Sequence, residues 1–431
     1  MTAGTTNNQQ YNSFDDMNFG QSQTSEPFFK VVEKTDDDVH KWLTSKVLET
    51  LNAAQIRIEK YRELMDFYRG QHYYYQQPDA RNPKSVFNQI MDMVDGRASR
   101  LQTYKSGYVF VPSKDGWDAR TNAESIKKIV DCDLDELCFE EDILHQTDKM
   151  IFQLGHCFTY IGEPDEDKKI KVEIFGPDKF FPELGKKKWD KVDYCFTTEF
   201  RNQYELMEDY DVRKDQIADG DGTEFDKKFI ERIMDSNEQQ VLVYTFWHRP
   251  TKYFPKGCKI IFTNGVILEK EDFPFKDKKL PFIPRTDIDC YGQFWGIPFT
   301  IKILQLQKHH NVISSIILKN QIQGRAKIAI PAGSIPSGAF DDETNTFEFN
   351  GPLAPQVIQA NLNNPDLYAY QTKIEDYIEK TSNYGGIQRG EIPAGITAAT
   401  ALKFIEEEKS LANKTTVVKR NKFVRMVIKT F

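Results

Sequence analysis

Apolar residues recur at every third or fourth position over several long stretches of the chain, which is the spacing of an amphipathic helix. The longest stretch runs from about Asp36 to Arg69, and Gly70 ends it. The same spacing predicts further helices at 87–101, 119–138, 140–154, 298–323 and 366–380. From Thr397 the helical pattern continues to Phe431 with no glycine or proline to stop it, and we expect the natural protein to continue beyond that residue.

Short segments rich in β-branched and aromatic residues dominate the middle of the chain. They predict strands at 108–112, 159–161, 171–175, 194–200, 241–247 and 259–262. The pair Asn264–Gly265 is a strong hairpin signal between the last of these strands and Val266. Helices and locally connected strands in this order predict an α+β protein.

The composition limits the function classes. The chain has 57 Lys and Arg against 65 Asp and Glu, a net charge of −8, which excludes a protein that wraps nucleic acid by bulk charge. Residues 1–26 are rich in Asn, Gln, Thr and Ser and predict a disordered arm. There is no run of about eighteen apolar residues, no secretory signal pattern and no C-x-x-C pair among the six cysteines. We therefore expect no membrane partner and reduced thiols in a cytoplasm.

No catalytic motif is recognisable in the sequence. It lacks phosphate-binding glycine loops, the H-E-x-x-H zinc motif and the G-x-S-x-G nucleophile turn. A zinc set could be drawn from Cys132, Cys138, His145 and Cys157, but their spacing fits no known zinc site, and buried structural thiols are the simpler interpretation. His309 and His310 are adjacent on a predicted helix and must point to different sides. We expect no catalytic residue, no metal and no cofactor, and an enzyme such as a nucleotidyltransferase or hydrolase is only a third alternative.

Charge is unevenly distributed along the chain. No Asp or Glu occurs from Cys290 to Phe340 or from Lys409 to the end, although lysines and arginines do. Either these helices present a solvated face, or they form a sparse basic lining that faces a polyanion without reading its bases. The lining residues would be Lys302, Lys308 and Lys319. Aromatic clusters such as Tyr73–Tyr75 and Phe180–Phe181 favour core and subunit contacts over base stacking.

The order of these features resembles the portal, or head–tail connector, proteins of tailed bacteriophages, nearest to those of short-tailed phages. The resemblance covers about residues 36–431, and its Asn/Gln/Lys-rich style is similar to that of crAss-like phages. The matching segments are Phe67–Gly70, Asn88–Ile90, Val94–Asp95, Gly155–Cys157, Gly176–Asp178, Leu280–Phe282, Tyr291–Gly292, the helix at Pro298 with Gln307 and Asn311, and Thr397–Leu402.

The resemblance implies a portal-like architecture with an α/β wing, long stem helices, a small β-containing clip and a long C-terminal helix. Its parts would be the arm at 1–26, the wing at 27–296, the first stem helix at 297–324, the clip at 325–365, the second stem helix at 366–384, a tunnel loop at 385–396 and a helix at 397–431 that leads towards the wing and a missing crown.

The resemblance also implies the sites and partners. Lys302, Lys308 and Lys319 would line a DNA channel, together with a tunnel loop of Ile387, Gln388 and Arg389. The clip would dock the large terminase motor and the tail adaptors through Arg325, Lys327, Phe347 and Phe349. The expected assembly is a dodecameric ring at the portal vertex of the virion, built in the host cytoplasm, that contacts the major capsid protein, passes double-stranded DNA and binds cargo proteins through the arm. The rival interpretation is another structural protein of a virion or filament that has no channel.

Overall fold

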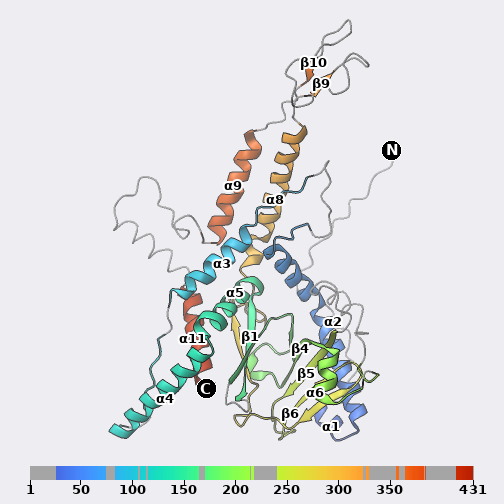
Figure 1. Cartoon of the computed structure of the whole chain (residues 1–431), viewed down its shortest axis with the longest axis vertical. Coiled ribbons are helices and arrows are strands. Elements are labelled where there is room, and N and C mark those ends of the chain that lie inside the picture. Colours follow the sequence, from blue (N-terminus) through green and yellow to red (C-terminus); the bar gives the residue numbers. More distant parts are fainter. Residues whose placement is uncertain are drawn as a thin grey trace. The chain divides into compact units, whose positions relative to one another are not determined.

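A computed structural model of the chain shows helices combined with antiparallel sheets (Figure 1). The structure describes residues 26–73, 83–104, 107–112, 115–164, 170–213, 215–217, 240–323, 327–329, 356–358, 365–382, 384 and 414–430. The chain divides into two compact units. Unit 1 consists of Met1–Asn52 with Thr198–Pro274, and unit 2 consists of Ala53–Thr197 with Phe275–Phe431.

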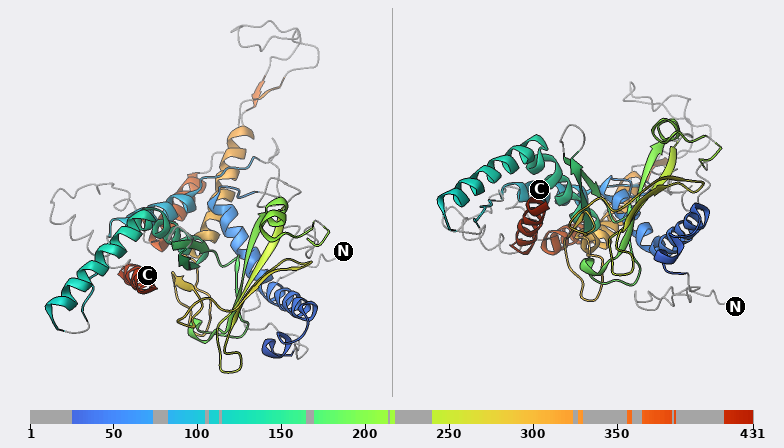
Figure 2. Two further views of the ribbon diagram at one scale, coloured as in Figure 1. Left: turned by 60° about the horizontal axis from the view of Figure 1, so that its bottom comes forward. Right: turned by 90° about the horizontal axis from the view of Figure 1, so that it is seen from below.

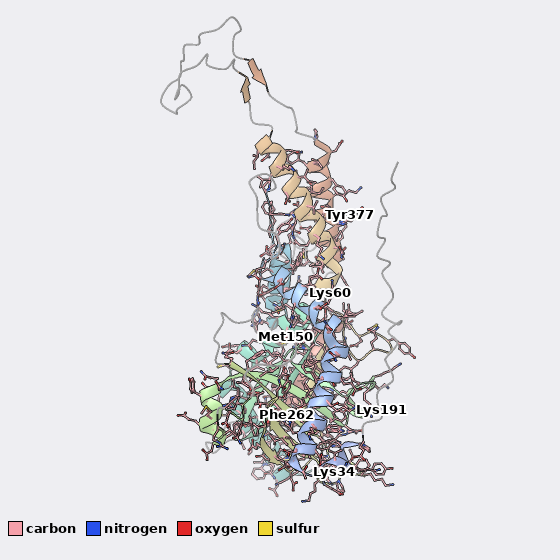
Figure 3. The ribbon with its side chains drawn as sticks, turned by 90° about the vertical axis from the view of Figure 1, so that its right-hand side faces the viewer. Lys34, Lys60, Met150, Lys191, Phe262 and Tyr377 are labelled. Atoms are coloured by element: carbon pink, nitrogen blue, oxygen red, sulfur yellow. The ribbon has the colours of Figure 1, made fainter. Side chains whose placement is uncertain are left out.

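Unit 1 combines a sheet with two short helices and the first half of the long helix α2. It contains all or part of α1 (Phe28–Val31), α2 (Asp36–Tyr68), β4 (Tyr194–Asn202), α6 (Gln203–Tyr210), β5 (Gln240–His248), β6 (Cys258–Phe262) and β7 (Ile267–Glu271). The strands lie in the order β4-β5-β6-β7. The ring of Phe28 on α1 lies 4.9 Å from the rings of both Trp42 and Phe246. These contacts attach the helices to the sheet, whose buried Phe262 is labelled in Figure 3.

The hairpin predicted at Asn264–Gly265 is confirmed, because β6 and β7 pair antiparallel on either side of it. The backbone N–H of Thr263 donates to the carbonyl of Val266 at 2.9 Å. The Thr263 hydroxyl also accepts from the N–H groups of Gly265 and Val266, each at 3.3 Å. The side chain thus satisfies the backbone of the turn, as is typical of threonine in such positions.

Unit 2 holds the remaining elements. They are α3 (Gln89–Gln102), α4 (Trp117–Glu136), η1 (Phe139–Ile143), α5 (Leu144–Leu154), β1 (His156–Pro164), β2 (Ile170–Phe175), β3 (Phe180–Pro182), η2 (Trp189–Lys191), β8 (Phe282–Thr286), α8 (Thr300–Gln323), β9 (Lys327–Ala329), β10 (Gln356–Ile358), α9 (Pro365–Ser382) and α11 (Lys414–Thr430). The second half of α2 and the start of β4 also belong to this unit.

A three-stranded antiparallel sheet, ordered β2-β1-β8, lies in unit 2. On the central strand Phe158 is opposite Phe175 of β2 and Pro284 of β8. Its ring also stacks on Phe180, with the centroids 3.7 Å apart. α5 contacts β1 and β8, and α11 contacts β8, so these two helices bury apolar side chains against the sheet.

The main helical core of unit 2 joins segments that are distant in the sequence. Its buried side chains include Tyr61 and Leu64 of α2, Ile90 and Val94 of α3, Ile151 of α5, Ile303 and Leu304 of α8, and Ile374 and Ile378 of α9. The predicted bounds agree with α2, α3, α8 and α9 to within a few residues.

The break between the two helices predicted at 119–138 and 140–154 is longer than expected, because the second α-helix begins only at Leu144. α4 ends at Glu136, and a five-residue π-helical turn, η1, precedes α5. Cys138 has a left-handed backbone (φ 47°) between α4 and η1. Such a conformation is strained for a residue with a side chain. It turns the chain so that Phe139 joins a second core with Val130 of α4 and Phe423 of α11.

Three sequence expectations about this unit are wrong. Residues 107–112 are extended but form no ladder with a strand in the described part of the chain. Tyr108 and Phe110 pack inward while Val109 and Val111 are 82% and 83% exposed, so alternation reports one buried side and not strand pairing. The short strands β3 and β8 were not predicted. Finally, Cys132 and Cys138 are exposed thiols, and of the imagined zinc set only the cysteine of β1 is a buried thiol.

Among the described residues, no helix is both long enough and apolar enough to pass through a bilayer.

Candidate functional site

The predicted stem helices, α8 and α9, form an antiparallel pair within unit 2 (Figure 1). Polar contacts join positions that advance along α8 and recede along α9: His310 contacts Glu375 at 2.9 Å, and Ser314 contacts Gln371 at 3.2 Å. After α8 the chain forms β9, returns through β10, which pairs antiparallel with β9, and then enters α9. The two helices are therefore the arms of one helical hairpin.

The three predicted lining lysines occupy different positions around α8. Lys302 is exposed, whereas Lys308 and Lys319 are partly buried. Because an α-helix advances about 100° per residue, Lys308 and Lys319 lie within about 20° of each other, and Lys302 lies about 120° from Lys308. The three side chains therefore do not share one face, and their role as a common lining stays a prediction.

Lys308 has partners inside the chain. Its ammonium group pairs with Glu63 of α2 and lies 5.5 Å from the centroid of the Phe67 ring. Burial alone would raise the pKa of Glu63, but hydrogen bonds from Lys308 and Lys60 hold that pKa below its ordinary value. The charge of Lys308 is thus partly neutralised, which leaves Lys302 as the exposed cation of the three.

The exposed face of α8 carries little charge. Its exposed positions among the described residues are Lys302, Gln305, His309, Val312, Ile316, Gln321 and Ile322, and the first five recur at intervals of three or four residues. Only the first of these is a permanent cation. Such a face can meet a polyanion only through sparse contacts, because affinity for phosphates scales with the number of cations that neutralise them.

Two buried amide side chains attach α8 to the segment before α3. Gln307 donates to the carbonyl of Phe87 at 2.8 Å and to the Asn311 side chain at 2.8 Å, and it accepts from the backbone N–H of Gln89 at 3.1 Å. Gln307 and Asn311 are 1% and 2% exposed. Buried polar groups are stable only when they are hydrogen-bonded, so these contacts fix both the rotation and the height of α8 against α3.

His72 extends this polar contact chain. Its Nδ1 lies 2.7 Å from the Asn311 amide nitrogen, and its Nε2 lies 2.8 Å from the carbonyl of Phe67. Since the amide donates to Nδ1, Nε2 carries the proton that it gives to the carbonyl. Burial lowers the pKa of His72, and the ring therefore stays neutral and stacks on Phe67 at 4.4 Å.

The adjacent histidines of α8 point in different directions, as predicted. His309 is exposed, and His310 is buried against α9, where it contacts Glu375. The side chain of Gln371 lies 3.4 Å from the same His310 nitrogen. The α8–α9 interface is therefore polar on one side, and its alignment is set by specific hydrogen bonds and not by apolar packing alone.

The segments that carry the portal resemblance meet one another in unit 2. The hydroxyl of Tyr68 donates to Asp95 at 2.8 Å, and the Asn88 side chain donates to the carbonyl of Tyr68 at 2.8 Å. Asn88 also caps α3 by accepting from the N–H of Met91 at 3.2 Å. Lys149 of α5 pairs with Asp95 at 3.1 Å. Burial and, to a smaller extent, the hydrogen bond to Asp95 raise the pKa of Tyr68 to about 12. The Tyr68 hydroxyl therefore keeps its proton and remains a hydrogen-bond donor.

The segment at Gly155, just before β1, meets the segment at Pro298, just before α8. Gly155 has φ +79°, and a Cβ atom there would come within 2.5 Å of the backbone nitrogen of Pro298. His156 is stacked between Phe158 and Phe294, with centroids 4.6 and 5.8 Å away. Burial lowers the pKa of His156 to about 3. This histidine is therefore a neutral packing element and not a general base at neutral pH.

The buried carboxylate of Asp148 joins α5, β8 and α11. Asp148 of α5 accepts from Arg285 of β8 and, at 3.2 Å, from Nε of Arg420 of α11. Arg420 also donates to the carbonyl of Tyr104 at 2.5 Å, and Arg285 donates to the hydroxyl of Thr147 at 2.7 Å. All three charged side chains are at most 3% exposed. This cluster anchors α11 to unit 2.

Asp287 is a second buried carboxylate in the same region. It is 6% exposed, and its Oδ2 atom has no hydrogen-bond partner. Burial raises the pKa of Asp287 to about 6, although Arg97, Lys419, Lys302 and Arg285 act to lower it. Its carbonyl accepts from Lys419 of α11 at 2.6 Å.

The buried thiols are not nucleophiles. Burial raises the pKa of Cys157 to about 12 and also raises the pKa of the Cys195 and Cys258 thiols. A thiol attacks only as its thiolate, so these side chains act as apolar filling.

The other predicted site residues lie at the edge of the described structure. Lys327 is the first residue of β9. The remaining clip and tunnel-loop residues lie outside the described residues: Arg325, Phe347, Phe349, Ile387, Gln388 and Arg389. The 1–25 part of the predicted arm, residues 218–239 and the 397–413 part of the last predicted helix also lie outside them.

No protein-family model matches the sequence, and no curated protein matches it at a significant level. The sequence analysis did not single out His72, Glu63, Asp148 or Arg420, which make the contacts described above. For the buried Asp148 and Arg420 the available signal was a charged residue on the apolar side of a predicted helix, since such residues are buried only with partners.

Proposed function

We propose that this chain is the subunit of a portal ring, a non-enzymatic conduit for double-stranded DNA at one capsid vertex. The observation that carries the proposal is the convergence of the resemblance segments. Tyr68 contacts both Asn88 and Asp95, and Gln307 and Asn311 attach α8 to the neighbouring Phe87 and His72.

The surface chemistry of α8 agrees with a conduit. Lys302 is the exposed cation among the three candidates, and Lys308 is engaged by Glu63. A wall with few free cations binds phosphates weakly, so that DNA can slide along it. The Cys157 thiol stays protonated and so lacks the thiolate that nucleophilic attack uses, and His156, with a pKa of about 3, is too weakly basic to hold a proton at neutral pH.

In this proposal the packaging motor is a separate ATPase, the large terminase, which docks on the clip together with the tail adaptors. The ring is dodecameric and contacts the major capsid protein in the virion. It assembles in the host cytoplasm, and the N-terminal arm binds cargo proteins. The α8–α9 hairpin would be the stem, and 385–396 would approach the DNA.

Mass photometry and negative-stain microscopy of the purified chain test the proposal. We expect closed rings of uniform size. A monodisperse monomer at tens of micromolar would contradict the proposal, and open filaments would favour the structural rival without a channel. In rings incorporated into phage, Lys302→Glu should slow DNA packaging, whereas Lys187→Glu, at an exposed position before η2, should leave its rate unchanged.

A further inference from the structure

Unit 2 carries a dense group of carboxylates where α4 ends and η1 begins. Residues 131–142 contain seven Asp or Glu residues and no Lys or Arg. Five of these carboxylates are exposed, and we call them the acidic surface: Asp135, Glu136, Glu140, Glu141 and Asp142. Beside them on α4, Ile129 is 61% exposed and lies within about 20° of Glu136 around the helix axis.

α11 has the opposite character, with six Lys or Arg residues and no Asp or Glu between 414 and 430. Lys419 and Arg420 are engaged within unit 2 by Asp289 and Asp148. The other four are exposed, and none of them pairs with a carboxylate among the described residues. With an exposed valine they form what we call the basic stripe: Lys414, Val418, Lys422, Arg425 and Lys429.

The basic stripe is continuous along the helix. At about 100° and 1.5 Å per residue, its five side chains fall within an arc of about 80° and extend over about 22 Å. Val418, which is 59% exposed, lies among the cations and adds an apolar side chain to the stripe. A stripe of this kind fits a protein surface that combines carboxylates with an apolar side chain, and the acidic surface with Ile129 is such a surface.

Both surfaces are held by one core. Val130, Leu134 and Phe139 pack in the same buried cluster as Phe423 and Val427, and α4 and α11 lie beside each other in both views of Figure 2. The same buried side chains therefore hold the acidic surface and the basic stripe in fixed positions within unit 2.

We propose that the acidic surface of one copy of the chain docks on the basic stripe of the next copy. Two different surfaces of the same chain make such a contact head to tail, and its repetition closes a ring when the rotation between copies permits. The inference rests on the proposed function, since it takes the ring as the assembly in which the contact repeats. The match of four exposed cations to five exposed carboxylates within one sequence is what selects a second copy as the partner.

Charge reversal tests the contact. Lys422→Glu/Arg425→Glu reverses the stripe, and Asp135→Lys/Glu141→Lys reverses the acidic surface. A third variant combines all four changes. Lys187→Glu/Lys188→Glu is the matched control for the stripe variant, because it makes the same change in net charge at two exposed lysines elsewhere in unit 2. All six substituted side chains are exposed in the structure, and thermal melting checks that each variant folds.

Mass photometry measures the protomer concentration at half-assembly for each variant. At about 0.05 M salt we expect each reversed pair to raise that concentration at least tenfold, and the control to leave it unchanged. The combined variant should return to within threefold of the starting chain, because its reversed charges attract again. At about 0.5 M salt the differences should shrink, since screening weakens contacts between exposed charges.

The failures of the two proposals are distinguishable. Rings that form equally well with either reversed pair would overturn the docking contact and leave the portal proposal intact. A starting chain that never assembles would overturn both. A stripe variant that assembles normally but loses affinity for a duplex oligonucleotide would assign the stripe to nucleic acid and overturn the contact between copies.

Discussion

The buried carboxylate of Asp148 offers the sharpest test of how unit 2 is held together. Its side chain is 0% exposed and lies between two guanidinium groups, those of Arg285 and Arg420. Asp148→Asn keeps the shape of the side chain and removes its charge. Two buried cations then lose their common counter-charge, and one of them belongs to α11.

The magnitude follows from the contacts. Removing one partner from a buried ion pair costs about 3–5 kcal/mol. We take about 3 kcal/mol, the lower end, because Arg420 keeps the carbonyl of Tyr104 and Arg285 keeps the hydroxyl of Thr147. Each 1.4 kcal/mol is tenfold in an equilibrium constant, so the opening of α11 should become about 100-fold more favourable.

Native-state hydrogen exchange measures this opening directly. In Asp148→Asn the amides of α11 should lose about 100-fold in protection, while those of β5–β7 in unit 1 should be unchanged. Asp115→Asn removes an exposed carboxylate and should leave α11 unaffected. A change of less than threefold in α11 would refute the view that Asp148 anchors this helix.

Three further predictions concern the same unit. Burial raises the pKa of Asp287 from 3.8 to about 6. Between these pH values the folded chain holds a proton that the unfolded chain has lost, so the stability of the folded chain falls as the pH rises through that window. Asp287→Asn should flatten this dependence in melting temperatures taken from pH 4 to pH 7. Gly155→Ala should destabilise by about 3 kcal/mol, because it adds a clash with Pro298 to backbone strain, whereas Gly185→Ala, at φ +80° in open space, should cost only about 1 kcal/mol in urea unfolding. Asn311→Leu should cost about 2 kcal/mol by the same assay, because it leaves the buried Gln307 and the partly buried His72 without a hydrogen-bond partner that each has in the folded chain. Val312→Leu on the exposed face should stay within about 0.5 kcal/mol.

Helices were the predictable part of the fold. Amphipathic spacing over many turns marks both the element and its buried face, which is why α2, α8 and α9 have nearly the predicted bounds. Strand pairing was less accessible, because a strand exists only through its neighbours. Residues 107–112 alternate as a strand should, yet they lie extended against a core with no described partner strand. β3 is only three residues long, too short for a periodic signal.

The site was predictable in residue types but not in partners. Gln307 and Asn311 were recognised as features of the helix, but their contacts with Phe87 and His72 span 220 and 239 residues of sequence. Local spacing carries no information about such distances. The lysine run was ambiguous for the same reason: only the folded chain shows that Lys308 meets Glu63 while Lys302 remains exposed.

The arrangement of α8 within an assembly is the central claim, and electron cryomicroscopy of the assembled chain tests it most directly. The account predicts a closed ring in which α8 and residues 385–396 face the central channel and Lys302 points into the lumen. A ring whose channel is lined by other elements, or a chain that remains monomeric, would contradict it.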